Sequence, residues 1–244
     1  SNMKRVGLEC GGKSPQVFMG DLPDMDEAVA AAYDGIFSNQ GEVCSAGSRL
    51  FVDAPIYDQF IEQFVAEGQH AYEPGPPLDP ETSMGPLVTR EAQQRVLGFI
   101  ESGKQEGAKL HFGGGVPDGL GGGAYVSPTL FSDVHNDMTI ARNEIFGPVA
   151  SVIPFNGVDE AIAMANDTIY GLAAGVWTKD IDKAFRMIKG IESGVVWVNC
   201  YEGGDMTQPF GGYKQSGHAR DKCMDSLRSY TQLKSAWIQL GPDR

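Results

Sequence analysis

Three segments in the first half of the chain repeat apolar residues at helical spacing. The first follows Asp24, which can cap a helix with Glu27 three residues further on. The apolar residues of its predicted inner face are Val29, Ala32, Tyr33 and Ile36. The second segment follows Pro55, and its apolar stripe consists of Ile56, Phe60, Ile61, Phe64 and Val65. The third helix is predicted over residues 90–105, with Ala92, Val96, Phe99 and Ile100 facing inward.

Glycine and proline mark the segments between these helices. Residues 4–12 have the pattern of a strand that runs directly into a glycine turn. Residues 73–80 (EPGPPLDP) break the helical periodicity and predict a loop. Two glycine triplets bracket a turn between strand candidates around Leu110 and Tyr125, so we expect a surface hairpin there.

From residue 149 onward, predicted strands and helices alternate. They cover 149–155, 158–165, 173–177, 181–191 and 195–198, with Asp180 as a helix cap. This alternation indicates an α/β fold with a largely parallel sheet flanked by helices. A short helix near 221–229 precedes an apolar last strand at 230–240, which has no partner after it in the sequence. Such a strand commonly adds to the sheet of another subunit, so we expect a C-terminal oligomerisation strand.

Composition and charge narrow the class of protein. The 244 residues are 41% hydrophobic and 21% charged, which is ordinary globular usage and argues against a disordered, fibrous or coiled-coil protein. The net charge of −13 argues against nucleic acid and against an anionic membrane as partners, because both require a basic surface. No stretch approaches the roughly 18 apolar residues of a membrane helix, and we recognise no signal peptide.

Cysteine and histidine usage predicts neither a metal site nor a disulfide framework. The four cysteines, at positions 10, 44, 200 and 223, form no CxxC pair, and the four histidines are equally scattered. Unpaired thiols are typical of the reducing cytoplasm, which is where we expect the protein to reside.

Cys44 is the first candidate for chemistry. It lies just past a predicted helix in a small, polar, glycine-containing segment, 37–49, which is an unusual place for a core residue. Two interpretations remain open. Cys44 is a nucleophile, which requires backbone N–H groups, a helix N-terminus or a cation to favour the thiolate, or it is a buried structural thiol.

Glu9 is the second candidate, because it places a carboxylate at the end of an otherwise apolar strand. Either it pairs with Lys13 or another neighbouring basic side chain, or burial raises its pKa towards neutrality. In the second case it could serve as a general base for a water molecule.

The segments around these two residues resemble signatures of the aldehyde dehydrogenase superfamily. Residues 8–15 (LECGGKSP) are similar to its glutamate signature and residues 40–44 (QGEVC) to its cysteine signature, and the interval between Glu9 and Cys44 is close to that of the family. Further matches follow in the family's order at 144–149, 166–180, 198–199 and 209–217. The resemblance covers essentially all of residues 3–244 and implies the α/β catalytic domain of an aldehyde dehydrogenase.

The resemblance also implies a mechanism. Cys44 would attack the aldehyde carbon to give a thiohemiacetal, and hydride transfer to the nicotinamide of NAD or NADP would leave a thioester. Glu9 would activate the water that hydrolyses this thioester. The acyl-CoA-forming branch of the superfamily lacks a glutamate here, so Glu9 favours hydrolysis to the carboxylic acid. Glu144 and Phe146 match residues that hold the nicotinamide ribose and flank the nicotinamide.

The implied substrate is a small-molecule aldehyde. The implied substrate-pocket residues are Phe210, Glu202, Asp205, Val43 and Ser45. Segments 204–210 and 217–222 look most similar to γ-glutamyl-γ-aminobutyraldehyde dehydrogenases and related aminoaldehyde enzymes. Negative charge from Glu202 and Asp205 would suit an amino-bearing aldehyde, and the alternative is that both are solvated loop acids.

The resemblance finally implies a domain organisation. Residues 1–2 look like the remnant of an expression tag, residues 3–228 like the catalytic domain, and residues 229–244 like the oligomerisation arm of a homodimer or homotetramer. The family's NAD-binding domain lies mostly before the position of Glu9, so we expect this chain to lack it and to be inactive in oxidation by itself. The alternatives are a cofactor-free thiol esterase or hydrolase, a betaine-aldehyde or broad-specificity aldehyde dehydrogenase, and a non-catalytic interaction domain.

Overall fold

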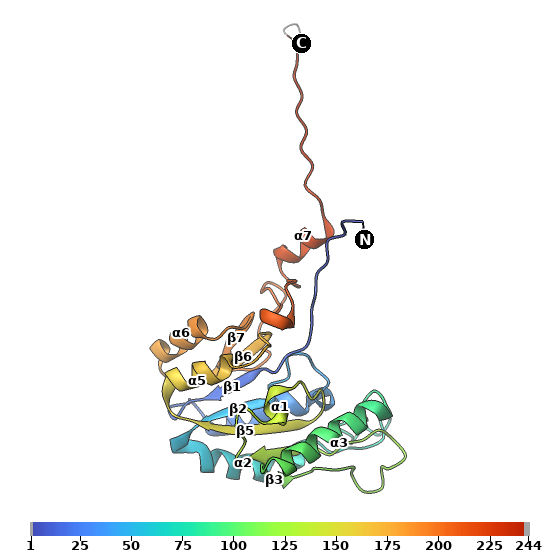
Figure 1. Cartoon of the computed structure of the whole chain (residues 1–244), viewed down its shortest axis with the longest axis vertical. Coiled ribbons are helices and arrows are strands. Elements are labelled where there is room, and N and C mark those ends of the chain that lie inside the picture. The colour runs from blue at the N-terminus through green and yellow to red at the C-terminus, as the bar shows by residue number, and fades with distance from the viewer. Residues whose placement is uncertain (1, 242–244) are drawn as a thin grey trace.

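A seven-stranded sheet forms the centre of the protein (Figure 1). The structure, a computed structural model, describes residues 2–241. The strands are β1 (Pro15–Phe18), β2 (Arg49–Asp53), β3 (Lys109–Phe112), β4 (Thr129–Ser132), β5 (Val149–Phe155), β6 (Ala173–Trp177) and β7 (Val195–Val198). Their order across the sheet is β3-β4-β5-β2-β1-β6-β7. Neighbours are parallel except β3 and β4, which are antiparallel, so the predicted α/β fold is confirmed.

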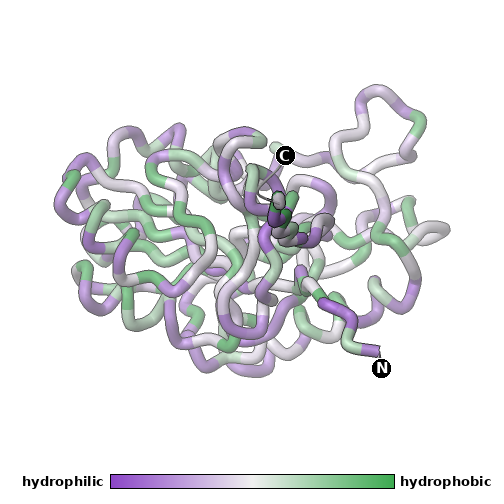
Figure 2. The backbone as a smooth tube through the Cα atoms, turned by 90° about the horizontal axis from the view of Figure 1, so that it is seen from above, coloured by the Kyte–Doolittle hydropathy of each residue, from purple (hydrophilic) through white to green (hydrophobic). Residues whose placement is uncertain are grey.

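Helices cover both faces of this sheet. The α-helices are α1 (Met25–Phe37), α2 (Tyr57–Ala71), α3 (Arg90–Gln105), α4 (Thr139–Arg142), α5 (Gly157–Asn166), α6 (Ile181–Gly190) and α7 (Leu227–Tyr230). Val17 and Phe18, which follow one another in β1, belong to two different apolar clusters because successive strand residues face opposite sides. The cluster with Phe18 contains buried apolar residues of α1 and α2, and the cluster with Val17 contains buried apolar residues of α3, α4, α5 and α6. Hydrophobic segments accordingly run through the interior of the body, with hydrophilic segments around most of its outline (Figure 2).

The predicted helices are confirmed, and two of the predicted caps are present. The Asp24 carboxylate accepts from the backbone N–H groups of Asp26 and Glu27 at the start of α1. The Asp180 carboxylate does the same for the first turn of α6. Predicted and observed bounds coincide for α3, β5, β6 and β7. These elements have clear periodicity or clear flanking turns, which explains the agreement.

Three strands, β1, β2 and β4, were not expected from the sequence. All four residues of β1 and of β4 are buried, and so are the first four of β2. A strand covered on both faces has no alternation of apolar and polar residues, so the period-2 signal is missing. The alternation of apolar and polar residues therefore does not predict the central strands β1 and β2.

Two expectations about strands in the first half are corrected. Residues 4–12 form no regular strand; they are extended, and within them the sole bridge joins Glu9 to Gly217. The regular strand begins later, at Pro15, where pairing with β2 starts, and β6 pairs on the other side from Gln16 onward. The strand that contains Leu110 is present and pairs in antiparallel orientation, as expected. Its partner, however, is β4 and not the segment around Tyr125. Tyr125 is buried and donates its hydroxyl to the carbonyl of Gly75 at 3.0 Å.

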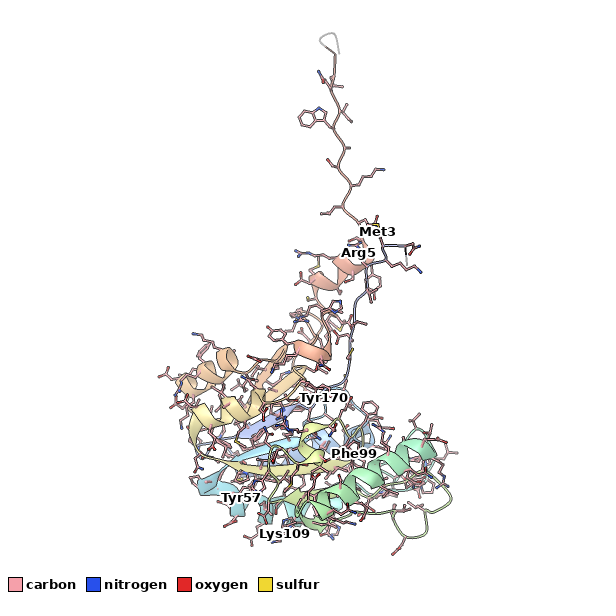
Figure 3. The ribbon with its side chains drawn as sticks, viewed as in Figure 1. Met3, Arg5, Tyr57, Phe99, Lys109 and Tyr170 are labelled. Atoms are coloured by element: carbon pink, nitrogen blue, oxygen red, sulfur yellow. The ribbon has the colours of Figure 1, made fainter. Side chains whose placement is uncertain are left out.

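The segment after α7 extends away from the body (Figure 1). The helical part near the C-terminus is shorter than expected, with a 3₁₀ turn at Met224–Ser226 followed by α7. Residues 231–241 belong to no helix or sheet of the described chain, and they expose Leu233, Trp237 and Ile238. At the base of this segment Arg5 donates to the carbonyl of Thr231 at 2.7 Å (Figure 3). Addition of this segment to another subunit stays a prediction, and residues 242–244 lie outside the described part.

Candidate active site

The candidate residues Glu9, Cys44 and Glu144 lie in three segments that lead into neighbouring strands. Glu9 precedes β1, Cys44 precedes β2 and Glu144 precedes β5, and these strands are adjacent and parallel. Parallel strands that are adjacent begin at the same edge of a sheet, so the three segments meet there. The Gly11-Gly12 turn lies between them, since a Cβ on Gly12 would come within 2.6 Å of the Cys44 carbonyl oxygen.

The loop that carries Cys44 is fixed by backbone hydrogen bonds. After α1 the chain makes a 3₁₀ turn at Ser38–Gly41, in which Gly41 has a φ of 70° and packs against the backbone of Gly147. Ala46 then donates to the carbonyl of Val43 at 3.0 Å, and Gly47 donates to the carbonyl of Gly35 in α1 at 2.9 Å. The half-buried thiol of Cys44 therefore projects from a loop with little freedom.

Opposing effects act on the thiol of Cys44. Burial raises its pKa above the ordinary value, while the backbone N–H groups of Ser45 and Cys44 lower it. The carboxylates of Glu9 and Glu144 raise the pKa further, because two nearby negative charges disfavour the thiolate. The two N–H groups are thus the built-in donors for a thiolate, or for an oxyanion that forms beside it.

Glu9 is held beside the segment that contains Phe210. The backbone around Glu9 pairs with residues 216–219, since Cys10 donates to Ser216 and both His218 and Ala219 donate to the Leu8 carbonyl. A Cβ on Gly211 would lie 2.7 Å from Oε1 of Glu9, so the carboxylate rests against a position that only a glycine leaves open.

Three influences act on the pKa of Glu9. Desolvation raises it above its usual range, Asp221 raises it further, and Arg220 partly offsets both. Arg220 is itself positioned by hydrogen bonds to the carbonyls of Gly212 and Ala219. A carboxylate with a raised pKa that remains partly exposed has the properties of a general base for water.

Glu144 lies across the glycine turn. Its Oε1 accepts from the N–H of Gly12 at 3.2 Å, and any Cβ on Gly11 would overlap its carboxylate. Desolvation raises the pKa of Glu144, whereas the Gly12 N–H, Arg95 and Lys13 lower it. The carboxylate is thus fixed in the site and is within range of two cations.

Two cations, Lys13 and Arg49, are buried beneath the site. The sequence predicted Lys13 only as a possible partner for Glu9, and the burial of both was not predicted. Lys13 is 1% exposed, and its Nζ has no hydrogen-bond partner among residues 2–241. Burial and the nearby Arg49 lower its pKa to about 7, although Glu144 acts in the opposite direction. Arg49 is fully buried and donates to the carbonyls of Lys13, Met164 and Ala165. For Arg49 the available signal was a basic residue directly before the apolar run Leu50–Val52, whereas Lys13 is followed by polar residues and had no such signal.

Phe146 and Val43 lie together on the Glu144 side of Cys44. Phe146 has a φ of 54°, a left-handed conformation that is uncommon for a bulky residue and is often found at functional sites. A cavity of about 10 Å³ is lined by both residues together with Gly12 and Glu144. Val43 therefore neighbours the expected cofactor residues in this structure.

Ser45 and Glu202, both expected in the substrate pocket, are joined by a hydrogen bond. The Ser45 hydroxyl donates to Oε1 of Glu202 at 2.8 Å. Glu202 also lines a cavity of about 290 Å³, and Asp34, Tyr72 and Tyr201 line it as well. Asp34 could not be selected from the sequence, because an acidic residue on a predicted helix is ordinarily a solvated surface residue.

The remaining two candidates, Phe210 and Asp205, have different surroundings. Phe210 is half-buried, pairs through its backbone with Asp221, and has the Lys222 ammonium 5.5 Å from its ring centre. Asp205 is exposed, and its carboxylate accepts from the N–H and hydroxyl of Thr207, which lowers its pKa. Asp205 does not line the cavity that contains Glu202.

Within residues 2–241, no cluster of histidine, cysteine and acidic side chains has the geometry to hold a metal ion. The same described residues contain no helix with the length and apolar character needed to cross a bilayer.

Comparisons with known proteins agree on one family. The model of the family described as "Aldehyde dehydrogenase family" matches residues 1–236. Aldehyde dehydrogenase 1A1 of Gallus gallus is 48% identical over 240 residues, which is 98% of this chain and 46% of that protein.

Solved structures give the same result. A γ-glutamyl-γ-aminobutyraldehyde dehydrogenase of Burkholderia cenocepacia J2315 is 54% identical with a TM-score of 0.92, and the match covers 96% of this chain and 47% of that one. An indole-3-acetaldehyde dehydrogenase of P. syringae in complex with NAD⁺ is 50% identical with a TM-score of 0.95, covering 98% and 48% of the two chains. The chain thus spans about half the length of the relatives it matches.

Proposed function

The chain belongs to the aldehyde dehydrogenase family, and from this premise we propose that it carries the catalytic residues of an enzyme that oxidises an aldehyde to a carboxylic acid with NAD. The observation that carries the proposal is the meeting of the segments of Glu9, Cys44 and Glu144 at one edge of the sheet, with Gly12 against the Cys44 carbonyl and bonded to Glu144. A nucleophile and a base for water are the groups that this chemistry requires from the protein, and Glu144 beside the glycine turn is the proposed contact to the cofactor.

Cys44 is the proposed nucleophile. Its thiolate adds to the aldehyde carbon, which forms a C–S bond and moves the carbonyl electrons onto oxygen. The backbone N–H groups of Cys44 and Ser45 lower the pKa of the thiol and so favour negative charge on the sulfur. Loss of hydride from the thiohemiacetal then leaves a thioester on Cys44.

Glu9 is the proposed base of the second half-reaction. Its carboxylate takes a proton from water, the oxygen attacks the thioester carbon, and the C–S bond breaks to release the acid and the thiolate. The raised pKa of Glu9 and its partial exposure support this role, because both favour proton transfer from a water molecule that can reach it. Hydrolysis is therefore proposed over transfer of the acyl group to coenzyme A.

Glu144 and Phe146 are the proposed contacts to the cofactor. The residues present fit a nicotinamide ribose, because bare glycines at positions 11 and 12 leave the Glu144 carboxylate room in the site. Hydroxyl groups of a ribose would donate to this carboxylate. Phe146 lies two residues after Glu144 with a left-handed backbone conformation, and its aromatic ring is the second proposed contact to the cofactor. A bound nicotinamide would supply the hydride acceptor. NAD is proposed over NADP because the similar structure from P. syringae contains NAD⁺.

We further propose an aminoaldehyde as the substrate. Its support is the cavity of about 290 Å³ beside Ser45, which carries the two carboxylates of Asp34 and Glu202 and the hydroxyl of Tyr72. Tyr72 donates to Asp34 at 3.0 Å, so this carboxylate is oriented. An ammonium group at the far end of a substrate would be attracted to such a wall. The similar γ-glutamyl-γ-aminobutyraldehyde dehydrogenase agrees with this class.

A second function, ester hydrolysis without cofactor, is supported by the composition of the site. The nucleophile, its N–H donors and the base all come from this chain. An activated ester needs no hydride transfer, because attack by Cys44 gives the acyl-enzyme directly.

The organisation proposed for the chain follows the family. Residues 3–228 form the catalytic domain, and residues 229–244 form an arm that adds to another subunit of a homo-oligomer in the cytoplasm. The exposed apolar side chains of the arm, such as Leu233 and Trp237, support a contact with protein.

The test is NADH formation by the native enzyme that carries this sequence, with aminoaldehydes compared against n-alkyl aldehydes of the same length. Cys44→Ser should abolish NADH formation with every aldehyde. Glu202→Gln should lower kcat/KM for the aminoaldehyde by about tenfold and leave the alkyl aldehyde nearly unchanged. Glu101→Gln, at an exposed acid paired with Lys104, is the matched control. No NADH with any aldehyde would overturn the activity, and equal loss for both aldehydes in Glu202→Gln would overturn the aminoaldehyde.

A further inference from the structure

Ser45, directly after the proposed nucleophile, is held through both of its polar groups by two consecutive residues. The hydroxyl of Tyr201 donates to the Ser45 carbonyl at 2.5 Å, and the Ser45 hydroxyl donates to Glu202 at 2.8 Å. These contacts join positions more than 150 residues apart, and they come from the segment after β7. We call Tyr201 and Glu202 the Ser45 clamp.

The ring of Tyr201 has little freedom to move. It lies against Gly35 of α1 and Gly175 of β6, where added Cβ atoms would come within 2.9 and 2.8 Å of the ring. On a third side Trp197 packs edge-on at 4.8 Å between ring centres. Burial raises the pKa of Tyr201, so its hydroxyl stays protonated and remains a hydrogen-bond donor at working pH. Its position is thus set by α1 and the sheet.

The clamp acts next to the groups that stabilise a thiolate. The N–H of Ser45 is one of the two backbone donors that lower the pKa of Cys44. The carbonyl and side chain of the same residue are the atoms that the clamp holds. The N–H and the carbonyl of Ser45 belong to different peptide planes and are separated by the φ and ψ torsions of Ser45. Because Tyr201 holds the carbonyl and Glu202 holds the side chain on the same Cα, the two contacts together limit these torsions and thereby the direction of the N–H.

We propose that the Ser45 clamp positions the backbone N–H groups against the sulfur of Cys44, and that Tyr201 is a positioning residue for the nucleophile. The proposal rests on the nucleophilic role of Cys44 given above. Without the Tyr201 hydroxyl, the Ser45 carbonyl loses its anchor, the N–H donors point at the sulfur for a smaller fraction of the time, and the thiolate is less favoured. In this role the Tyr201 hydroxyl acts on the Ser45 carbonyl and not on the sulfur, and it is a separate feature that Tyr201 also lines the cavity proposed for the substrate.

Glu202 has two functions in this arrangement. One carboxylate oxygen accepts from Ser45, and the residue also lines the cavity proposed for the amino group of the substrate. Occupation of that cavity is therefore coupled to the loop of the nucleophile through Ser45.

The experiment measures alkylation of Cys44 by iodoacetamide as a function of pH in this chain. Peptide mass spectrometry separates Cys44 from Cys10, Cys200 and Cys223. Tyr201→Phe keeps the ring and removes the hydroxyl. We expect its alkylation profile for Cys44 to move to higher pH, with a rate at neutral pH reduced about three- to tenfold, which is the range for loss of one hydrogen bond.

A matched control is available in Tyr125→Phe, which also removes a buried tyrosine hydroxyl bonded to a backbone carbonyl. Its profile for Cys44 should equal that of the unmodified chain, and so should the profile of Cys10 in both variants. Ser45→Ala removes the second contact of the clamp without touching an aromatic ring, and a smaller shift in the same direction is expected.

A Tyr201→Phe profile that superimposes on that of the unmodified chain would overturn the clamp. If Tyr201→Phe does not fold, as shown by its thermal melt, Ser45→Ala decides in the same way. Failure of the proposed function has a different signature. In that case Cys44 of the unmodified chain would form no acyl adduct with an activated ester, whatever the variants do.

Discussion

Gly12 donates its backbone N–H to Oε1 of Glu144 at 3.2 Å, although 132 positions separate the two residues. Glu144 lies across the turn formed by Gly11 and Gly12, and the next residue, Lys13, is a buried cation that also acts on it. The turn therefore places the proposed cofactor carboxylate and connects it to the backbone of the nucleophile, whose carbonyl approaches Gly12.

Gly11→Ala should displace Glu144 without direct contact with Cys44. An added Cβ would overlap the carboxylate, so Glu144 must rotate away and lose the Gly12 bond. Loss of a hydrogen bond to a charged group corresponds to a factor of about ten or more. We expect KM for NAD in the native enzyme to rise by about that factor, while ester acylation of Cys44 is retained. An unchanged KM for NAD would show that the position of Glu144 is unimportant for the cofactor.

Glu9→Gln should separate acylation from deacylation. The amide cannot take a proton from water, so hydrolysis of the thioester should slow by about a hundredfold or more, whereas formation of the thioester continues. Mass spectrometry of the chain after mixing with an activated ester should show an acyl group that persists on Cys44.

The pH dependence of Glu9 gives a second readout. The base must be ionised, so deacylation should be lost as the pH falls through the raised pKa of Glu9. The small residual deacylation rate of Glu9→Gln should not show this fall at low pH. Equal deacylation rates in the two proteins would exclude Glu9 as the base.

Lys13→Met should change how stability depends on pH. The pKa of Lys13 is lowered from 10.5 to about 7, so between these values the unfolded chain binds more protons than the folded one. The free energy of unfolding therefore rises with pH across this window, and Lys13 contributes a penalty that is largest on the acidic side. A methionine of similar length removes the penalty.

The measurement for Lys13 is urea denaturation at several pH values between neutral and alkaline. Lys13→Met should be more stable than the unmodified chain by at least about 1 kcal/mol at neutral pH, and the difference should shrink as the pH rises. Lys104→Met, at a lysine paired with Glu101 on the surface, should leave the pH dependence unchanged. Parallel curves for Lys13→Met and the unmodified chain would contradict the lowered pKa.

Sequence reasoning succeeded where one residue pattern decides a local structure. The helices that begin after Asp24 and Asp180 have caps and regular apolar faces, and both were predicted and found. Strands β5, β6 and β7 follow clear turns, and their bounds were predicted as well. The central strands β1 and β2 were missed because burial on both faces removes the alternating pattern.

The candidate site could be predicted in part. The residue pattern selected Cys44 and Glu9 and the resemblance added Glu144, and the structure places the segments of all three at one edge of the sheet. Contacts between distant segments could not be read from local patterns, which is why the bond between Ser45 and Glu202 was not expected and why Lys13 was treated only as a partner for Glu9. The unpaired Nζ of Lys13 in the described chain depends on tertiary burial that no single segment reveals.

The central claim is that Cys44 forms a covalent acyl intermediate, and the most direct test is the intact mass of the chain after brief exposure to an activated ester, followed by peptide mapping. We predict one added acyl group on the peptide that contains Cys44, with no acyl group on the peptides of the exposed residues Cys10 and Cys200. The adduct should be absent in Cys44→Ser. An acyl group distributed over the exposed cysteines, or an adduct that persists in Cys44→Ser, would contradict the account.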